Sequence, residues 1–235
     1  MQITFRCVCR TLITGCLFAG LFGCASAPGR DPRDPFEPFN RSMESFNDAV
    51  DGAVLKPVAM VYRDVTPDPL RTAVGNFFGN LSDVWSTLNT AMQLRVEDTV
   101  INALRLGFNT LFGFGGLLDI ASEMNLYRSP ADFGQTLGYW GVPAGPYLVL
   151  PILGPSTVRD TLGRSVEARG DLVLGLDHVP TRNSLYALRA VETRANLLRA
   201  SSVLDEAALD KYSFTREVFL SRRQSAIEAQ RHRDE

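Results

Sequence analysis

Few residues in this sequence are of the types that carry out chemistry, and the most distinctive of them is Cys24. The other three cysteines, Cys7, Cys9 and Cys16, all precede it. A chain cut just before Cys24 would keep one thiol, which has no partner for the internal disulfide bonds that exported proteins often form. A single thiol at a new N-terminus is instead suited to acylation. The chemistry that we expect here is covalent attachment of lipid.

The residues before Cys24 support this prediction. Arg6 and Arg10 give the chain a positive start, and Thr11–Gly23 is uncharged, largely apolar and shorter than the roughly 20 residues that cross a bilayer as a helix. This order is typical of an export signal. The ending, Leu21-Phe22-Gly23-Cys24, resembles a lipoprotein signal, so we predict a signal peptide over 1–24 and acyl chains such as palmitate on Cys24. The alternative is an ordinary signal peptide cut elsewhere.

The remaining candidates do not combine into a catalytic or metal site. His178 and His232 are the only histidines and no cysteine follows Cys24, so the usual ligand sets for zinc are missing. The sequence contains neither G-x-S-x-G nor G-x-x-x-x-G-K-[ST], the motifs of a hydrolase elbow and of ATP hydrolysis. Gly113-Phe114-Gly115-Gly116 lacks the spacing of a nucleotide-binding loop. We predict a protein that is not an enzyme and that holds no metal and no cofactor other than its covalent lipid.

Charge narrows the class of partner. The 235 residues carry a formal net charge of −2, and loss of Arg6 and Arg10 with the signal makes it two units more negative. Nucleic-acid binding needs clusters of basic residues, so we expect no nucleic acid as partner. An acidic chain is also not drawn to anionic lipid by charge alone. Association with a membrane must therefore be hydrophobic.

The elements that would position functional residues are helices, and the first begins at Asp34-Pro35, a pair that suits an N-cap followed by the first helical residue. Apolar residues then recur at spacings of three and four: Phe36, Phe39, Met43, Phe46 and Val50. Such a stripe indicates one apolar face of a helix. That face either packs on the core of a soluble bundle or lies in a membrane surface, and periodicity alone does not separate these alternatives.

Similar patterns predict four more helical segments and no clear strand. We expect a helix over 70–94 with breaks near Gly75 and Gly79, and another over 96–112. Helical structure resumes near Thr181 and continues after Tyr212. The apolar positions of the second and third of these helices are Val100, Leu104, Phe108 and Leu111, and Leu185, Leu188, Val191, Ala195 and Leu198. The fold class is all-α.

The segment Phe133–Val158 is the least ordinary part of the sequence. It contains no formal charge over a length that could cross a bilayer. Its four prolines and five glycines forbid a regular spanning helix. Irregular backbone at membrane depth must be buried in protein or line a cavity. We therefore expect this segment to form non-helical lining or a rim.

Several blocks, in this order, suggest a family. They are Asp34-Pro35-Phe36-Glu37-Pro38-Phe39-Asn40-Arg41, Phe46-Asn47, Lys56-Pro57-Val58-Ala59, Tyr62-Arg63-Asp64, Asn76-Phe77-Phe78, Asn80-Leu81, Asn109-Thr110, Gly113, Gly115-Gly116, Phe133-Gly134-Gln135-Thr136-Leu137-Gly138, Gly145-Pro146-Tyr147, Gly154-Pro155-Ser156 and Arg159-Asp160. Over about residues 34–200 the chain resembles the MlaA lipoproteins, also called VacJ. The tail after about Tyr212 matches poorly.

The resemblance implies a ring-shaped assembly of amphipathic helices that lies in the inner leaflet of the outer membrane around a central channel. It implies trimeric porins as partners, and mislocalised phospholipid as the transported ligand. The lipid would pass to the periplasmic carrier MlaC, so that outer-membrane lipid asymmetry is maintained. Ala25, which is not Asp, agrees with sorting to the outer membrane. The runner-up is a structural lipoprotein that braces porins without a lipid path.

Residue roles and boundaries follow from the same comparison. Phe46 and Asn47 would hold the first helix in a closed ring, or be a core and a surface residue. Gly113, Gly115 and Gly116 would mark a bend that opens or closes the channel, or a plain helix C-cap. Arg159 and Asp160 would pair near the periplasmic mouth, or lie in a solvated turn. We place the signal at 1–24, a tether at 25–33, the helical domain at 34–211, and a C-terminal helix and charged tail at 212–235.

Overall fold

The structure, a computed structural model, describes residues 31–207 and 209–232, together with all their side chains except those of 205–207 and 232. Cys24 and the predicted signal lie outside these residues. The elements are α2 (Glu37–Val50), the π-helical turn η1 (Asp51–Leu55), α3 (Lys56–Val65), α4 (Asp68–Met92), α5 (Val96–Leu111), α6 (Ile120–Glu123), α7 (Phe133–Tyr139), β1 (Tyr147–Leu150), β2 (Gly154–Thr157), α8 (Val158–Arg169), α9 (Val179–Ala207) and α10 (Lys211–His232).

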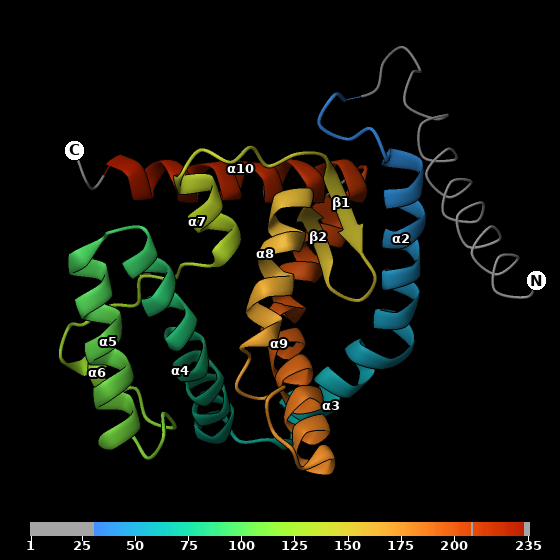
Figure 1. The fold of residues 1–235 in the computed structure, drawn as a ribbon. Helices are drawn as coiled ribbons and strands as arrows, with labels where there is room; N and C mark the ends of the chain where they lie inside the picture. The colour runs from blue at the N-terminus through green and yellow to red at the C-terminus, as the bar shows by residue number, and fades with distance from the viewer. Residues whose placement is uncertain (1–30, 208, 233–235) are drawn as a thin grey trace, which may run out of the picture.

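The helices form a ring-like frame rather than a bundle around one apolar core (Figure 1). Helix α10 runs along one side of the frame, α2 along the next, and α3 lies opposite α10. The α4–α5 hairpin forms the fourth side, and α8 and α9 lie between it and α2. Contacts of α3 and α4 with α9, and of α7 with α4, α8 and α10, connect the sides. None of the described helices combines the length and low charge needed to cross a bilayer.

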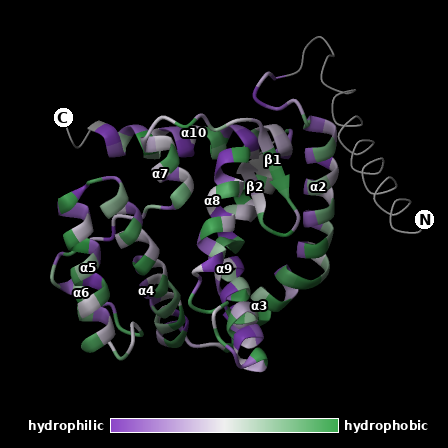
Figure 2. Ribbon diagram, in the orientation of Figure 1, coloured by the Kyte–Doolittle hydropathy of each residue, from purple (hydrophilic) through white to green (hydrophobic). Residues whose placement is uncertain are grey.

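The frame buries polar side chains and exposes apolar ones, an inversion of the pattern in soluble proteins. On α5 the buried positions are Asp98, Asn102, Arg105 and Asn109, at spacings of four, three and four. The opposite face is apolar and exposed, with Val100, Leu104 and Leu111 leaving 50%, 44% and 77% of their surface uncovered. Figure 2 shows this alternation along the α4–α5 hairpin. Soluble proteins bury their apolar residues, so the predicted stripe on this helix is not a core-facing stripe.

In helix α2 the buried residue is Asn40, while Phe39 and Phe46 are exposed and Met43 packs on an apolar cluster. The structure also corrects the predicted start of this helix. It begins at Glu37, with Phe36 at the N-cap position. Asp34 is not the cap. Its carboxylate is fully buried and accepts hydrogen bonds from Asn40 (2.8 Å), Arg216 (3.0 Å) and Tyr212. This interior network outweighs the local preference of Asp for a cap.

The predicted breaks in 70–94 are also wrong, because α4 is continuous over Asp68–Met92. Gly75 and Gly79 are sites of close approach. A Cβ at Gly75 would lie 2.9 Å from the Glu192 carboxylate, and one at Gly79 would lie 2.6 Å from the Arg128 guanidinium. Glycine therefore admits charged side chains against the helix, which outweighs its poor helix propensity.

The uncharged segment 133–158 is more regular than expected. It contains α7, whose N-terminus carries a capping box of Asp132 and Gln135. It also contains the antiparallel hairpin β1–β2, in which Tyr147 pairs with Thr157 and Leu150 with Gly154. The prediction that the chain has no strands was wrong at this one hairpin, whose strands are only four residues long each. The described part of the chain is otherwise helical or irregular.

Contacts of the helical domain extend beyond both of its predicted ends. The backbone of Arg33 accepts a hydrogen bond from Tyr147 N at 2.8 Å, so the fold already includes the last predicted tether residue. Helix α10 is part of the frame, and its Tyr212 ring packs on that of Tyr147 at 6.1 Å. Arg231 belongs to the helix and donates to the carbonyl oxygen of Gly138 at 2.7 Å. Helical structure in contact with the frame therefore continues to Arg231.

Candidate functional site

A cavity of about 840 Å³ lies between α4 on one side and α8 and α9 on the other. We call it the central cavity. The loop 130–132, the tip of the β1–β2 hairpin and the segment 171–173 complete its wall. The wall residues used below are Leu81 and Trp85 from α4, Ile152 and Leu153 from the hairpin tip, Arg164 and Glu167 from α8, Leu172 and Val173, and Arg189, Arg194 and Leu197 from α9. The wall is therefore amphipathic.

Two of the arginines in this wall are neutralised by acids. Arg189 Nη1 lies 2.9 Å from Asp171 Oδ2, and Arg194 Nε lies 2.6 Å from Asp51 Oδ1. Asp51 is the first residue of the π-helical turn η1. The second pair therefore ties α9 to the bend between α2 and α3 and fixes one corner of the cavity.

Glu167 is a half-buried carboxylate of the wall. Its Oε1 accepts hydrogen bonds from the backbone N–H of Phe133 at 2.7 Å and from Asn89 Nδ2 at 3.2 Å. Burial raises the pKa of Glu167, and these two hydrogen bonds offset only part of that effect. The side chain is thus held in one orientation between α4 and α7.

A buried ionic network supports the wall where α7, α8 and α10 meet. Arg223 of α10 donates to Asp132 Oδ1 at 2.9 Å and lies 2.8 Å from Asp160 Oδ1. Arg159 pairs with Asp160 at 3.1 Å, and both side chains are buried. Although burial opposes the effect, the hydrogen bond and charge of Arg223 lower the pKa of Asp132. Removing one partner of the Arg159–Asp160 pair would leave an uncompensated buried charge, which is strongly destabilising.

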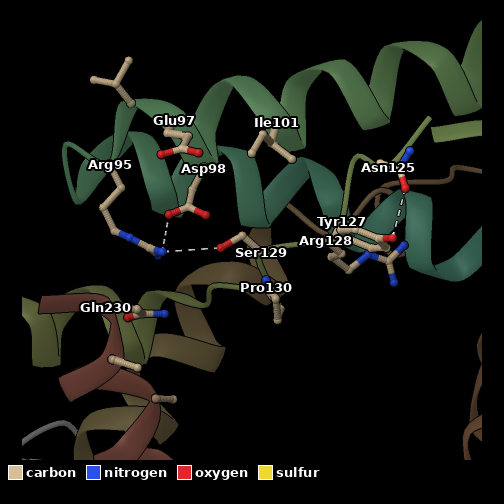
Figure 3. A pocket seen from close by; sticks show the side chains of 13 residues that line it. Arg95, Glu97, Asp98, Ile101, Asn125, Tyr127, Arg128, Ser129, Pro130 and Gln230 are labelled. Carbon is tan, nitrogen blue, oxygen red and sulfur yellow. Dashed lines mark hydrogen bonds and ion pairs between the residues drawn. The ribbon is translucent and has the colours of Figure 1, made fainter. Parts of the chain in front are cut away.

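A second cavity of about 600 Å³ lies between the start of α5, the loop 125–130 and the end of α10 (Figure 3). Its wall includes Arg95, which is 3% exposed and pairs with Asp98, and the amide of Gln230. Polar groups make up more of this wall than of the central cavity. The central cavity is therefore better suited to a ligand with long apolar chains.

Neither Phe46 nor Asn47 contributes to the wall of the central cavity. Phe46 is 48% exposed on α2. Asn47 binds the hairpin tip: its Nδ2 donates to Leu150 O at 2.9 Å and its Oδ1 accepts from Ile152 N at 2.7 Å. Because Ile152 lines the cavity, Asn47 positions part of the cavity wall without lining it.

The three glycines lie in the turn after α5, away from the central cavity. Gly115 and Gly116 have φ of +73° and +96°, in the left-handed region that favours glycine. Their N–H groups donate to Thr110 O and Asn109 O, which ends α5 as a C-cap does. Gly116 also packs against α4, where a Cβ would lie 2.6 Å from that of Asn80. The turn after α5 therefore packs closely on α4 at Gly116.

Arg159 and Asp160 form an ion pair in the buried network, not in a solvated turn. Sequence reasoning missed the charged residues of the cavity itself. Arg164 and Glu167 are three residues apart on a strongly polar helix, which is the usual pattern of a solvated face. Across the described residues no group of three or more His, Cys, Asp and Glu is arranged to hold a metal ion.

The fold and cavity define a class of protein: a helical frame with an apolar outer side around an amphipathic cavity. The family model for MlaA lipoproteins matches residues 32–226, and the chain belongs to that family. It is similar to the intermembrane phospholipid transport system lipoproteins MlaA of Shigella flexneri (37% identity, 86% of this chain, 82% of the relative) and Escherichia coli strain K12 (36%, 86%, 82%).

A relative of the same name from Haemophilus influenzae is 32% identical over 89% of this chain and 87% of its own. One solved structure, from work on how bacterial outer-membrane lipid asymmetry is maintained, aligns with a TM-score of 0.73. It is 34% identical, with 84% of this chain and 100% of the other covered. This likeness agrees with the predicted helical, ring-like fold.

Proposed function

We propose that this protein removes mislocalised phospholipids from the outer leaflet of the outer membrane and passes them through the central cavity to a periplasmic carrier, MlaC. Its place is the periplasmic leaflet of that membrane, with an acylated Cys24 as anchor and trimeric porins as partners. Three relatives named for intermembrane phospholipid transport support this proposal. The single observation that carries it is the inverted polarity of the frame around an amphipathic cavity.

The physical argument starts from the cost of moving a phospholipid through water. Each CH₂ group that leaves an apolar environment costs about 0.8 kcal/mol, so two bare acyl chains cost tens of kcal/mol. The apolar residues of the cavity wall, such as Leu81, Trp85 and Leu197, can shield the chains. The charged residues of the same wall can solvate the headgroup. The sequence has no ATP-hydrolysis motif, so direction would come from the lipid gradient or from a partner.

Phospholipid exposure on the cell surface tests the proposal. A strain that lacks the protein should show more phospholipid in the outer leaflet than its parent, and the intact gene should reverse this. A Cys24→Ala variant should fail to reverse it, because the unanchored protein would not be held at the membrane. Unchanged exposure in the deletion strain would contradict the proposed function.

The alternative is a structural lipoprotein that braces porins and has no lipid path. Protein purified in mild detergent separates the two proposals, because only a lipid-transporting protein should carry phospholipid in the central cavity. A test of hydrolysis belongs in the same preparation. We expect no release of fatty acid from added phospholipid, and its release would instead support an enzyme.

A further inference from the structure

Arg164 and Glu167 carry opposite charges on one face of α8, and both line the central cavity. Among the described residues, no ion pair joins the two. The guanidinium of Arg164 reaches only the carbonyl oxygens of Leu153 and Pro155 at the hairpin, each at 3.4 Å. These contacts are long for hydrogen bonds. Most of the donor capacity of Arg164 is therefore open to another acceptor.

The other charged groups of the wall are already neutralised. Asp132 pairs with Arg223, and Asp171 pairs with Arg189. Asp51 likewise neutralises Arg194. Arg164 and Glu167 are left as one cation and one anion that line the same cavity without a direct ion pair among these residues, although the charge of Arg164 acts on Asp132 and that of Arg223 on Glu167.

Glu167 is oriented for a ligand by its own hydrogen bonds. The two donors from α4 and α7 both bind Oε1, which leaves Oε2 for another donor. Burial raises the pKa of this carboxyl group, and a cation bound beside it would favour the ionised form again. The site therefore suits a ligand that brings its own positive charge.

We propose that Arg164 and Glu167 form a headgroup subsite for a zwitterionic phospholipid with a primary amine, the phosphoethanolamine type. The phosphate accepts hydrogen bonds from Arg164, a geometry to which a guanidinium is suited. The ammonium group donates to Glu167 Oε2. Ile152, Leu172 and Val173 lie in the same cavity wall and receive the start of the acyl chains. This inference rests on the proposed transport function and names the lipid class that the cavity selects.

The amine is what distinguishes this ligand from other phospholipids. A phosphoglycerol headgroup places no cation at Glu167, so the carboxylate would form no direct ion pair. A quaternary ammonium carries charge but has no N–H to donate. Specificity of this kind arises because a buried polar group left without a partner is costly.

The test uses full-length lipidated protein purified in mild detergent from its own membrane, with bound phospholipids quantified by class. The variants are Glu167→Gln and Arg164→Gln. Arg169→Gln is the matched control, because Arg169 is exposed on the same helix and lies outside the cavity wall. Gln at 167 keeps an oxygen for Phe133 N and Asn89, so the fold should persist; circular dichroism checks this.

We expect wild-type protein to be enriched in phosphoethanolamine lipid relative to the membrane. Glu167→Gln should lower the ratio of phosphoethanolamine to phosphoglycerol lipid by about tenfold, and Arg164→Gln should lower the amount of both by a similar factor. Arg169→Gln should change neither quantity. An unchanged ratio in Glu167→Gln overturns the subsite and leaves the transport function standing. Wild-type protein without phospholipid overturns both.

Discussion

Asn47 on α2 accepts a hydrogen bond from the backbone N–H of Ile152 at 2.7 Å, across a separation of 105 residues. Ile152 sits at the hairpin tip with φ of +65°, an unfavourable conformation for a β-branched residue. Two turns earlier on α2, Asn40 binds β1 in the same way. Its Nδ2 donates to Tyr147 O and its Oδ1 accepts from Val149 N. Two asparagines seven residues apart therefore hold the edge of the hairpin against α2.

Replacing Asn47 by Ala should loosen the hairpin tip. The change leaves Leu150 O and Ile152 N without their partner, and the strained backbone at Ile152 would relax. Because the site is partly exposed, we expect a loss of about 1 kcal/mol in the free energy of unfolding. Amide hydrogen exchange at residues 150, 152 and 153 should rise several-fold, while exchange in α5 stays constant. Ser45→Ala, on an exposed turn of α2, is the control, and equal exchange in both variants would contradict the role of Asn47.

The glycines after α5 should differ in their tolerance of Ala. Gly116→Ala meets Asn80 in addition to its left-handed φ, so we expect a loss of at least 2 kcal/mol. Gly115→Ala has open space around it and should lose only about 1 kcal/mol from backbone strain. Gly107→Ala, in the interior of α5 with no atom nearby, should gain up to about 1 kcal/mol. Denaturant unfolding in detergent measures all three, and equal losses at Gly115 and Gly116 would mean that contact with α4 is unimportant.

The helical elements were largely predictable from the sequence, because the spacing of apolar residues is the same whether they face inward or outward. The stripe Val100, Leu104, Phe108 and Leu111 places α5 within one residue of its observed end at Leu111. The direction of that stripe was not predictable, since an amphipathic helix has the same pattern whether its apolar side faces a core or a lipid layer. Only the structure shows that the polar face of α5 is buried and its apolar stripe exposed.

The candidate site was harder to predict, for a different physical reason. Arg164 and Glu167 are ordinary surface residues by sequence, and only the approach of α4 and of the hairpin tip makes them part of a cavity wall. Contacts between distant segments, such as that of Asn47 with Ile152, leave no local signal. The four-residue strands were missed because Pro146 and Pro151 flank β1 and hide its short pattern.

Asp119 should make stability depend on acid pH. Burial opposes ionisation there, but hydrogen bonds from Ser122, Asn109 and Arg105 lower the pKa of Asp119 to about 2 from 3.8. A lowered pKa in the folded state stabilises the fold above the unfolded-state value, and this contribution disappears as pH falls from about 4 to 2. We expect Asp119→Asn to cost on the order of 2 kcal/mol at pH 7 and much less at pH 2.

Unfolding in denaturant across this pH range measures the difference. Asp64→Asn is the control, because Asp64 is exposed and pairs with its neighbour Arg63. The free energy of unfolding of this variant should equal that of the wild type at every pH. A constant gap between Asp119→Asn and the wild type down to pH 2 would show that the carboxylate does not titrate in this window.

The exposed apolar face of α5 should be the part of the frame that meets lipid. Leu104 lies on that face and is 44% exposed, so Leu104→Glu places a charge where hydrocarbon contact is expected without disturbing the interior. The cost of a charge in a bilayer, on the order of 1–3 kcal/mol at this depth, corresponds to roughly a tenfold to hundredfold loss of membrane binding. Vesicle flotation of protein carrying Cys24→Ala measures this without help from the lipid anchor. Asn183→Glu, on an exposed position of α9, adds the same charge outside the face and should bind as the parent does. Equal flotation of the two variants would mean that α5 faces another protein, such as a porin, rather than lipid.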